Sequence, residues 1–344
     1  MKTKLRLWLI MAFVVGATGT IVLYNIHRPR LLIIHSSASE NAQMRPINRG
    51  LRDVLRDKTQ FSIRWYYTGL NSIGSKHLAE LESVRVRSLI SAMQPDVILA
   101  VGDEVQEYVA RHYANDPRIK IVYCAVHEDV APYGLDHATN ATGSLMTPPI
   151  EALTEMLQLM GQQLALTKPI RVLHIGDKTD DVKDDGNYMA RQKWAKLRFI
   201  GNEYVGNFEE WKLVLGRVEK HADFIVTSEY RTLARSSSDP ALVPAQEVVD
   251  WTVSHTPVPV VGTRSQYVMD GGMLAVGASL YEQGKEGGNI AIRLLEQHTS
   301  PREIPASTSK EFVIAANESR LKEKNLYLPD IYRALARASN NYFQ

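Results

Sequence analysis

The strongest constraint on the fold is a repeated alternation, after residue 30, of short apolar runs and amphipathic helical stretches. The first run, RLLIIH at Arg30–His35, ends in two serines, and the apolar residues of segment 47–55 recur on one helical face. Uninterrupted apolar strands are typical of a parallel sheet that helices cover on both faces. The next runs of this kind are Phe61–Tyr67, Val97–Val101 and Ile119–Val126. These residues predict one α/β lobe with a parallel sheet.

A second set of the same units begins at Ile170–Ile175, where the run ends in Gly176-Asp177. Its further strands are expected at Leu197–Val205, Asp223–Thr227 and Val258–Val261. The 344 residues also suit two domains, since a domain commonly takes about 100–200 residues. In doubly wound lobes the carboxyl ends of the strands border a crevice, and ligands bind in that crevice. We therefore expect two similar lobes and a cleft between them.

The amino-terminal segment, residues 1–29, is expected to be a membrane anchor or a signal segment. Leu7–Tyr24 is uncharged, and as a helix it would span about 27 Å, close to the thickness of a bilayer core. This length favours an uncleaved anchor with the rest of the chain outside the cytoplasm. The alternative is a cleaved signal peptide, because Ala17-Thr18-Gly19 forms a small-x-small site.

Charge, cysteine content and motifs exclude several classes of protein. The net charge of +2 includes four basic residues before residue 30, so the remaining chain has 36 basic and 38 acidic residues. A nearly neutral body argues against nucleic acid as the main partner. Cys124, the lone cysteine, is predicted to be a buried apolar residue. Since no HExxH, GxSxG or P-loop motif occurs, we predict no enzyme activity, no catalytic residue, no cofactor and no metal.

Four stretches of the chain resemble a known family. Pro257–Pro305 has the order of strand, turn, short strand and a helix with a Tyr-x-x-Gly pattern. Dispersed similarity is added by Lys120–Leu135 (KIVYCAVHEDVAPYGL), by Asn140–Leu145 (NATGSL) and by a closing segment at Asn317–Leu321 and Leu326–Pro329. Together these stretches resemble the extracytoplasmic substrate-binding proteins of ABC transporters, in the subgroup that includes aromatic amino-acid binders. The resemblance extends over about residues 30–335.

The resemblance implies a type I periplasmic-binding-protein fold with a three-crossing hinge. Carried onto this chain, the crossings fall near Asn140–Pro149, Tyr267–Leu274 and Pro305–Glu311. The amino-terminal lobe would then comprise residues 30–144 plus 272–306, and the carboxyl-terminal lobe 145–271 plus 307–344. Such a hinge allows the lobes to close around a ligand.

The expected function follows from this resemblance. The chain is expected to capture a small molecule in the interlobe cleft and to pass it to the permease of an ABC transporter. The alternative is a membrane-anchored sensing module that reports cleft occupancy to a partner membrane protein. In both cases we expect a periplasmic or extracytoplasmic location, with tethering to the inner membrane through residues 7–24.

Candidate ligand-binding residues are those that follow the predicted strands, because the carboxyl ends of parallel strands face the crevice. Acidic side chains outnumber basic ones in these positions, which favours a ligand with an amine, such as an amino acid. The open alternative is that these acids are ordinary turn and helix-capping residues. The candidate residues are Ser36, Ser37, Gly102, Asp103, His127, Glu128, Asp177, Thr179, Asp180, Ser228, Glu229, Tyr230, Thr263, Arg264 and Tyr267.

The acidic run from Asp177 to Gly186 has the composition of a calcium loop but lacks its spacing. An EF-hand loop that began at Asp181 would have Lys183 at its third position and Gln192 at its twelfth, where oxygen ligands are required. We therefore predict that this run is a solvated turn at the rim of the cleft.

Overall fold

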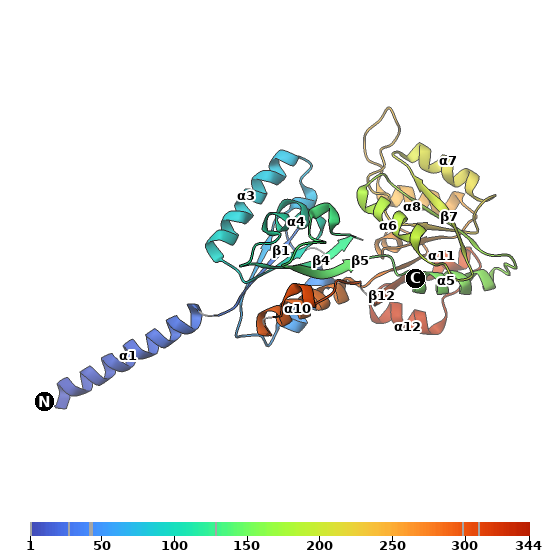
Figure 1. Cartoon of the computed structure of the whole chain (residues 1–344). Coiled ribbons are helices and arrows are strands. Elements are labelled where there is room, and N and C mark those ends of the chain that lie inside the picture. Colours follow the sequence, from blue (N-terminus) through green and yellow to red (C-terminus); the bar gives the residue numbers. More distant parts are fainter. Residues whose placement is uncertain (1, 27, 41–43, 128, 298, 309) are drawn as a thin grey trace. The chain divides into compact units, whose positions relative to one another are not determined.

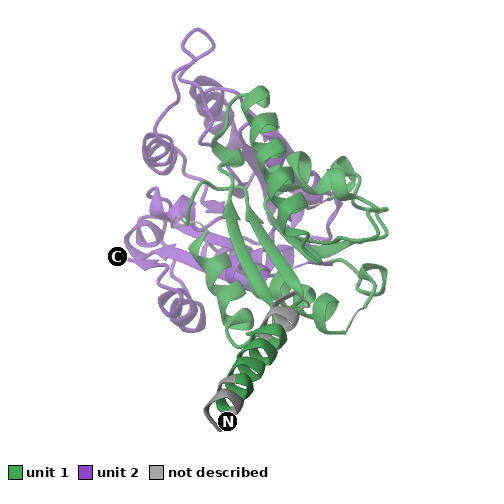
Figure 2. Ribbon diagram, turned by 90° about the vertical axis from the view of Figure 1, so that its left-hand side faces the viewer, with its two compact units in different colours: residues 1–124, 130–143, 284–306 green, residues 125–129, 144–283, 307–344 purple. Residues whose placement is uncertain are grey.

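The computed structural model describes residues 2–26, 28–40, 44–127, 129–297, 299–308 and 310–344. The chain folds into two compact α/β units (Figure 1). Unit 1 comprises residues 1–124, 130–143 and 284–306, and unit 2 comprises residues 125–129, 144–283 and 307–344, as Figure 2 shows in two colours. The prediction of two α/β lobes with parallel sheets is confirmed.

The first sheet has six strands in the order β11-β5-β4-β3-β1-β2. β1 pairs in parallel with both β2 and β3, and β3 pairs in parallel with β4. Figure 1 shows α3 and α4 over one face of this sheet and α10 over the other. The strands are β1 (Arg30–His35), β2 (Ser62–Tyr67), β3 (Val97–Val101), β4 (Lys120–His127), β5 (Ala141–Met146) and β11 (Ser307–Thr308). The helices of unit 1 after residue 30 are α2 (Arg45–Leu55), α3 (Lys76–Met93), α4 (Asp103–Tyr108) and α10 (Leu280–Glu296), whose first turn belongs to unit 2.

The second sheet has seven strands in the order β13-β12-β10-β9-β8-β6-β7. Its central strands are parallel, whereas β12 runs antiparallel to β10. The strands are β6 (Arg171–Gly176), β7 (Arg198–Tyr204), β8 (Phe224–Thr227), β9 (Val260–Gly262), β10 (Leu274–Ala278), β12 (Phe312–Asn317) and β13 (Tyr342–Phe343). The helices are α5 (Ile150–Gln163), α6 (Asp180–Arg191), α7 (Phe208–Val218), α8 (Ala245–His255), α9 (Gln266–Met269), α11 (Glu318–Glu323) and α12 (Asp330–Ala338). Single turns of 3-10 helix lie at Leu70–Ser72, Ala110–Tyr113, Ala131–Tyr133 and Pro301–Glu303.

The core of unit 2 has two layers because successive side chains of a strand point to opposite faces of the sheet. On β8, Phe224 and Val226 pack in one cluster with residues of α5 and α12. Ile225, between them, packs in the other cluster with residues of α7 and α8. All three side chains are fully buried. This double burial explains why the strand is apolar throughout instead of alternating.

Two segments that are predicted in the amino-terminal lobe lie in unit 2 instead, namely residues 125–129 and residues 272–283. For residues 272–283 the reason is the pairing of β10, whose Leu274 lies opposite Val261 of β9 and whose Val276 lies opposite Ile314 of β12. A strand paired on both sides belongs to that sheet, so the chain changes units only after Gln283.

The amino-terminal helix α1 comprises Lys2–Ile26. Within the described part of the chain, none of the helices combines the length and the apolar character that a bilayer-spanning segment needs. The expected membrane span at residues 7–24 is therefore not confirmed.

Candidate functional site

Each unit contains the same arrangement of strands around a topological switch point. In both sheets the first strand of the unit lies between the second and the third, in the orders β2-β1-β3 and β7-β6-β8. In open α/β sheets, ligands bind beyond the carboxyl ends of the strands at which the order reverses. The candidate site of unit 1 therefore lies after β1 and β3, and that of unit 2 lies after β6 and β8.

In unit 1, Ser36 and Gly102 approach each other closely at this position. The backbone N–H of Ser36 donates to the carbonyl of Val101 over 3.1 Å. Gly102 has a φ of +93°, and a Cβ at this residue would lie 2.5 Å from Ser36 Oγ. The neighbouring Ser37 Oγ donates to the carbonyl of Ser39 over 3.1 Å, so this hydroxyl closes a turn. Glycine is therefore required at residue 102 for both its conformation and its contact with Ser36.

Asp103 is the first residue of α4. An acidic side chain in the first turn interacts favourably with the amino end of a helix. The hydroxyl of Tyr133 donates to Asp103 Oδ1 over 3.0 Å and orients the carboxylate. This geometry suits either of the two roles, namely support of the helix end or acceptance of a ligand ammonium.

In unit 2, Asp177 and Thr179 build the turn between β6 and α6. Asp177 is buried, and its Oδ1 accepts from the backbone N–H and the hydroxyl of Thr179 over 3.1 and 2.6 Å. Its Oδ2 accepts from the backbone N–H of Thr232 over 3.2 Å. Asp180 is exposed and pairs with Lys183 over 2.8 Å. The carboxylate of Asp177 thus serves the turn, and Asp180 forms an ordinary surface ion pair.

Arg264 is the centre of a cluster of charges after β8 and β9. Its guanidinium lies 3.4 Å from Glu229 Oε2 and 3.6 Å from Asp185 Oδ2. Burial disfavours the charged guanidinium, but Asp185, Glu229, Asp181 and Asp177 more than offset this effect and raise the pKa of Arg264. Burial raises the pKa of Glu229, although Arg264 opposes the shift.

His127, the last residue of β4, is assigned to unit 2 by its contacts. Its Nε2 lies 3.2 Å from Nη2 of Arg264, and its Nδ1 lies 3.7 Å from Oδ2 of Asp181. A guanidinium can only donate hydrogen bonds, so Nε2 of His127 is the acceptor. The proton of this neutral imidazole therefore lies on Nδ1, on the side of Asp181.

Ser228, at the end of β8, forms a hydrogen bond that the sequence analysis missed. Its Oγ lies 3.0 Å from Nε2 of His174 on β6, and Nδ1 of His174 lies 3.0 Å from Oδ1 of Asn202 on β7. Ser228 is 4% exposed, whereas His174 is fully buried. The sequence does show a polar residue, His174, within the apolar run of β6. Its partners could not be predicted because they lie on or directly after two other strands.

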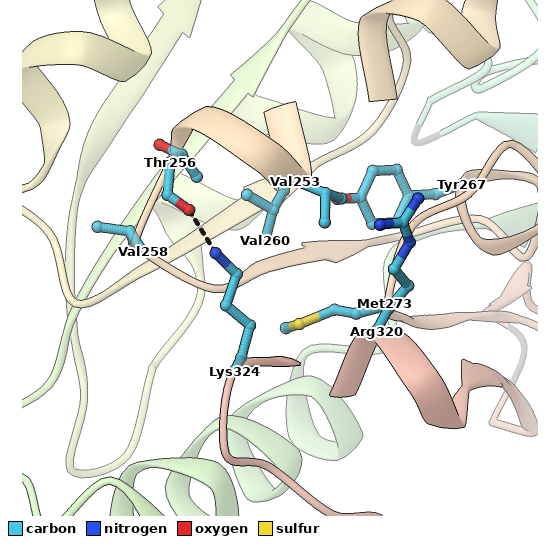
Figure 3. A pocket seen from close by; sticks show the side chains of 8 residues that line it. All are labelled: Val253, Thr256, Val258, Val260, Tyr267, Met273, Arg320 and Lys324. Atoms are coloured by element: carbon cyan, nitrogen blue, oxygen red, sulfur yellow. Dashed lines mark hydrogen bonds between the residues drawn. The ribbon is translucent and has the colours of Figure 1, made fainter. Parts of the chain in front are cut away.

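Two aromatic candidates, Tyr230 and Tyr267, pack in the core of unit 2 and not in the polar strand-end cluster. Tyr230 is buried, and its hydroxyl donates to Asp270 Oδ2 over 2.6 Å. Tyr267 packs edge-on against Tyr230 with ring centroids 6.1 Å apart. Its side chain lines a cavity of about 10 Å³ together with Val253, Val258 and Val260, as Figure 3 shows. Apolar packing decides the position of both rings, although each follows a strand end in the sequence.

The remaining candidates are placed as follows. Thr263 is buried, and its hydroxyl has no hydrogen-bond partner within the part of the chain that the structure describes. Glu128 lies outside the described residues. The predicted burial of Cys124 is confirmed, and burial raises the pKa of its thiol to about 12.

The prediction of a solvated turn for the acidic run is wrong over most of its length. Residues 180–191 form α6, and Asp185 is buried against Arg264. Asp181 and Asp185 are four residues apart and therefore share one face of the helix. This spacing was visible in the sequence, but the cation that the face meets comes from the end of β9.

Comparison with models of protein families matches residues 38–340 to the ABC transporter substrate binding proteins. The chain belongs to this family. A search of curated protein sequences gave no match.

Solved structures support the fold of this substrate-binding protein. The ligand-free, open structure of CD0873, a substrate-binding protein with adhesive properties from Clostridium difficile, has a TM-score of 0.65 and 16% identity, and the match covers 88% of this chain and 96% of that one. The ABC domain in complex with L-Trp from Streptococcus pneumoniae has a TM-score of 0.56 and 12% identity, and the match covers 89% of this chain and 98% of that one. GanP, a glucose-galactose binding protein from Geobacillus stearothermophilus, has a TM-score of 0.51 and 13% identity, and the match covers 84% of this chain and 98% of that one.

Membership of this family carries three consequences for the chain. The protein binds a small molecule, its partner is the permease of an ABC transporter, and its location is extracytoplasmic. The matched family and the structures above are substrate-binding proteins and not enzymes. The bound molecules named for the similar structures range from an amino acid to sugars, so the fold by itself does not identify the solute.

Proposed function

We propose that this substrate-binding protein captures a small solute with an amine, such as an amino acid, through residues at its strand ends and delivers it to an ABC permease. The observation that carries the proposal is the surplus of carboxylates around Arg264. Asp185 and Glu229 already lie within 4 Å of the guanidinium, so its positive charge is largely offset. Asp181 contributes further negative potential at the same position.

The acceptors near Arg264 support an ammonium ligand in particular. The side chain of Asp185 is 6% exposed and that of Glu229 is 21% exposed, so Glu229 is the more accessible of the two. A partly buried carboxylate forms a stronger hydrogen bond to a charged donor than one in bulk water. An anionic solute would instead meet the carboxylates of Asp185 and Glu229 beside Arg264, and the second guanidinium near Glu229, that of Arg231, is already paired with Asp270.

Calorimetric titration of the full chain with amino acids, polyamines and neutral sugars tests this proposal. We expect saturable binding for at least one solute that carries an ammonium group. Saturable binding of anionic or uncharged solutes alone would contradict the amine, and binding of none of them would count against the site.

A pair of variants then locates the contact. Glu229→Gln is expected to weaken binding of the amine about ten-fold, since a hydrogen bond to a charged group contributes about 1.5–3 kcal/mol. Glu323→Gln makes the same chemical change at a half-exposed residue of unit 2 that pairs with Arg320. If the two variants bind the amine with equal affinity, Glu229 does not contact the solute.

Transport is favoured over the sensing alternative because the family match is to transporter components. Tethering through residues 7–24 stays a prediction that the structure does not support. The intact mass of the protein isolated from its host reports whether residues 1–19 are retained. Release of the retained form by salt or alkaline washing would contradict an anchor in the membrane.

A further inference from the structure

A series of buried and partly buried hydrogen bonds in unit 2 ends at the hydroxyl of Ser228. It begins at the backbone carbonyl of Gly186 on α6, to which Nδ2 of Asn202 donates over 3.2 Å. Oδ1 of Asn202 then meets Nδ1 of His174 over 3.0 Å, and Nε2 of His174 meets Oγ of Ser228 over 3.0 Å. These groups come from α6, β7, β6 and the residue that follows β8, and they meet next to the switch point of the sheet.

The chemistry of each group fixes the direction of these hydrogen bonds. The carbonyl of Gly186 can only accept, so the amide nitrogen of Asn202 faces it and the amide oxygen faces His174. That oxygen can only accept as well, so His174 carries its proton on Nδ1. In a neutral imidazole the other nitrogen then accepts, and Ser228 must donate to it.

The imidazole stays neutral over the physiological range of pH. Burial lowers the pKa of His174 to about 4, against the opposing effects of Asp185 and Asn202. The direction of the hydrogen bonds is therefore the same at pH 7 and at pH 5.

We propose that His174 and Asn202 are positioning residues that hold the hydroxyl proton of Ser228 towards the interior, so that Ser228 offers the solute only oxygen lone pairs. This inference deepens the proposed function and rests on it. Ser228 then selects solutes that donate an N–H or O–H and discriminates against those that present a carbonyl or carboxylate oxygen. The next residue, Glu229, is an acceptor of the same kind, so both positions at the end of β8 favour a donor.

Nitrogen NMR of the imidazole rings tests the direction of the hydrogen bond between Ser228 and His174 without any ligand. In the full chain labelled with ¹⁵N-histidine, long-range proton–nitrogen correlation distinguishes a protonated from an unprotonated ring nitrogen. The signals of His174 among the ten histidines are assigned by their loss in His174→Gln. We expect Nδ1 protonated and Nε2 unprotonated from pH 7 to pH 5. An Nε2–H tautomer, or an imidazolium in this range, would overturn the proposal.

Three variants distinguish positioning from a merely structural role. Asn202→Leu removes the acceptor at Nδ1 and is expected to give a mixture of the two tautomers, whereas Asn202→Asp keeps an acceptor there and restores the Nδ1–H form. Thr227→Val is the matched control, because the Thr227 hydroxyl lies one residue from Ser228, is fully buried and has no partner. This control should leave the signals of His174 unchanged. An unaltered tautomer in Asn202→Leu would show that Asn202 does not direct the proton.

The tautomer of His174 and the binding of an amine can be confirmed or rejected independently of each other. An Nδ1–H tautomer in a protein that binds no amine would retain the positioning of Ser228 and reject the amine solute. An Nε2–H tautomer in a protein that does bind an amine would reject the positioning and retain the function.

Discussion

Two buried histidines, one in the first strand of each unit, differ in what surrounds their rings. His35 on β1 and His174 on β6 are both fully buried, and burial lowers the pKa of each to about 4. Both ring nitrogens of His174 have hydrogen-bond partners, whereas among the described residues neither nitrogen of His35 has one. The comparison teaches that burial is the main influence on the protonation state of both rings, while the hydrogen-bond partners set the tautomer.

His35 is held by aromatic contacts instead of hydrogen bonds. Its ring stacks on that of Tyr67 with centroids 4.7 Å apart and an interplanar angle of 12°, and on that of Trp65 at 5.7 Å and 7°. Arg52 lies over the Trp65 ring at 5.5 Å and pairs with Glu40. The two nitrogens are thus desolvated without compensation, which costs about 1–3 kcal/mol for each polar group that remains unpaired. Stacking offsets part of this cost.

The largest effect that the comparison predicts is a loss of stability in acid. Both pKa values fall from 6.5 in the unfolded chain to about 4 in the fold, so the stability from the neutral rings is complete above pH 6.5 and is lost as the pH falls to about 4. At about 1.4 kcal/mol per pKa unit, each histidine loses about 3 kcal/mol. Urea denaturation at pH 7 and pH 4 measures the loss, and His35→Phe should reduce it by about 3 kcal/mol. A variant that keeps the full loss would exclude His35 as a source.

The second effect is specific to His174. In His174→Leu, the hydroxyl of Ser228 and the amide oxygen of Asn202 lose their partner while they remain at least half buried. The free energy of unfolding at pH 7 is expected to fall by about 3 kcal/mol, from the desolvation cost of unpaired polar groups. Urea denaturation measures it, with Thr227→Val as the control that removes an unpartnered hydroxyl nearby. A loss of less than about 1 kcal/mol would mean that the pairing of His174 contributes little.

A third and smaller effect concerns the helix that faces His174. A Cβ at Gly186 would lie 2.2 Å from Tyr204 Oη and 2.8 Å from Asn202 Oδ1, so Gly186→Ala must displace both side chains. We expect a loss of about 1–3 kcal/mol, the usual range for overpacking. Gly216→Ala on α7 is the matched control, since no atom lies within 4 Å of its added Cβ, and it should stabilise the protein by about 0.5–1 kcal/mol. Equal effects of the two variants would show that Gly186 leaves room for the methyl group.

The smallest effect is expected for His35→Phe at pH 7. Phenylalanine keeps a ring between Trp65 and Tyr67 and removes two unpartnered nitrogens, so the free energy of unfolding should change by no more than about 1 kcal/mol. Thermal and urea denaturation measure it. A loss near that of His174→Leu would break the comparison, because it would reveal a polar role for His35.

The strands and their ends could be predicted from the sequence because both depend on local pattern. The run RLLIIH became β1, VILAV became β3, and Ser36, Gly102, Ser228 and Arg264 do lie after strands. Local pattern did not determine the features that packing decides. Tyr230 and Tyr267 follow strand ends but point into the core, and β10 joined unit 2 through its pairing with β9 and β12.

The sequence by itself determined where the chain turns from strand to helix, and therefore which polar residues stand at the ends of β1, β3, β8 and β9. Only the tertiary structure decided which of them meet. His174 reaches Asn202 28 residues away and Ser228 54 residues away. These contacts exist because β6 lies between β7 and β8 in the sheet. Strand order results from the burial of whole layers of side chains. The local sequence of β6 does not predict which strands pair with it. The direction of a single hydroxyl proton thus depends on the order of three strands.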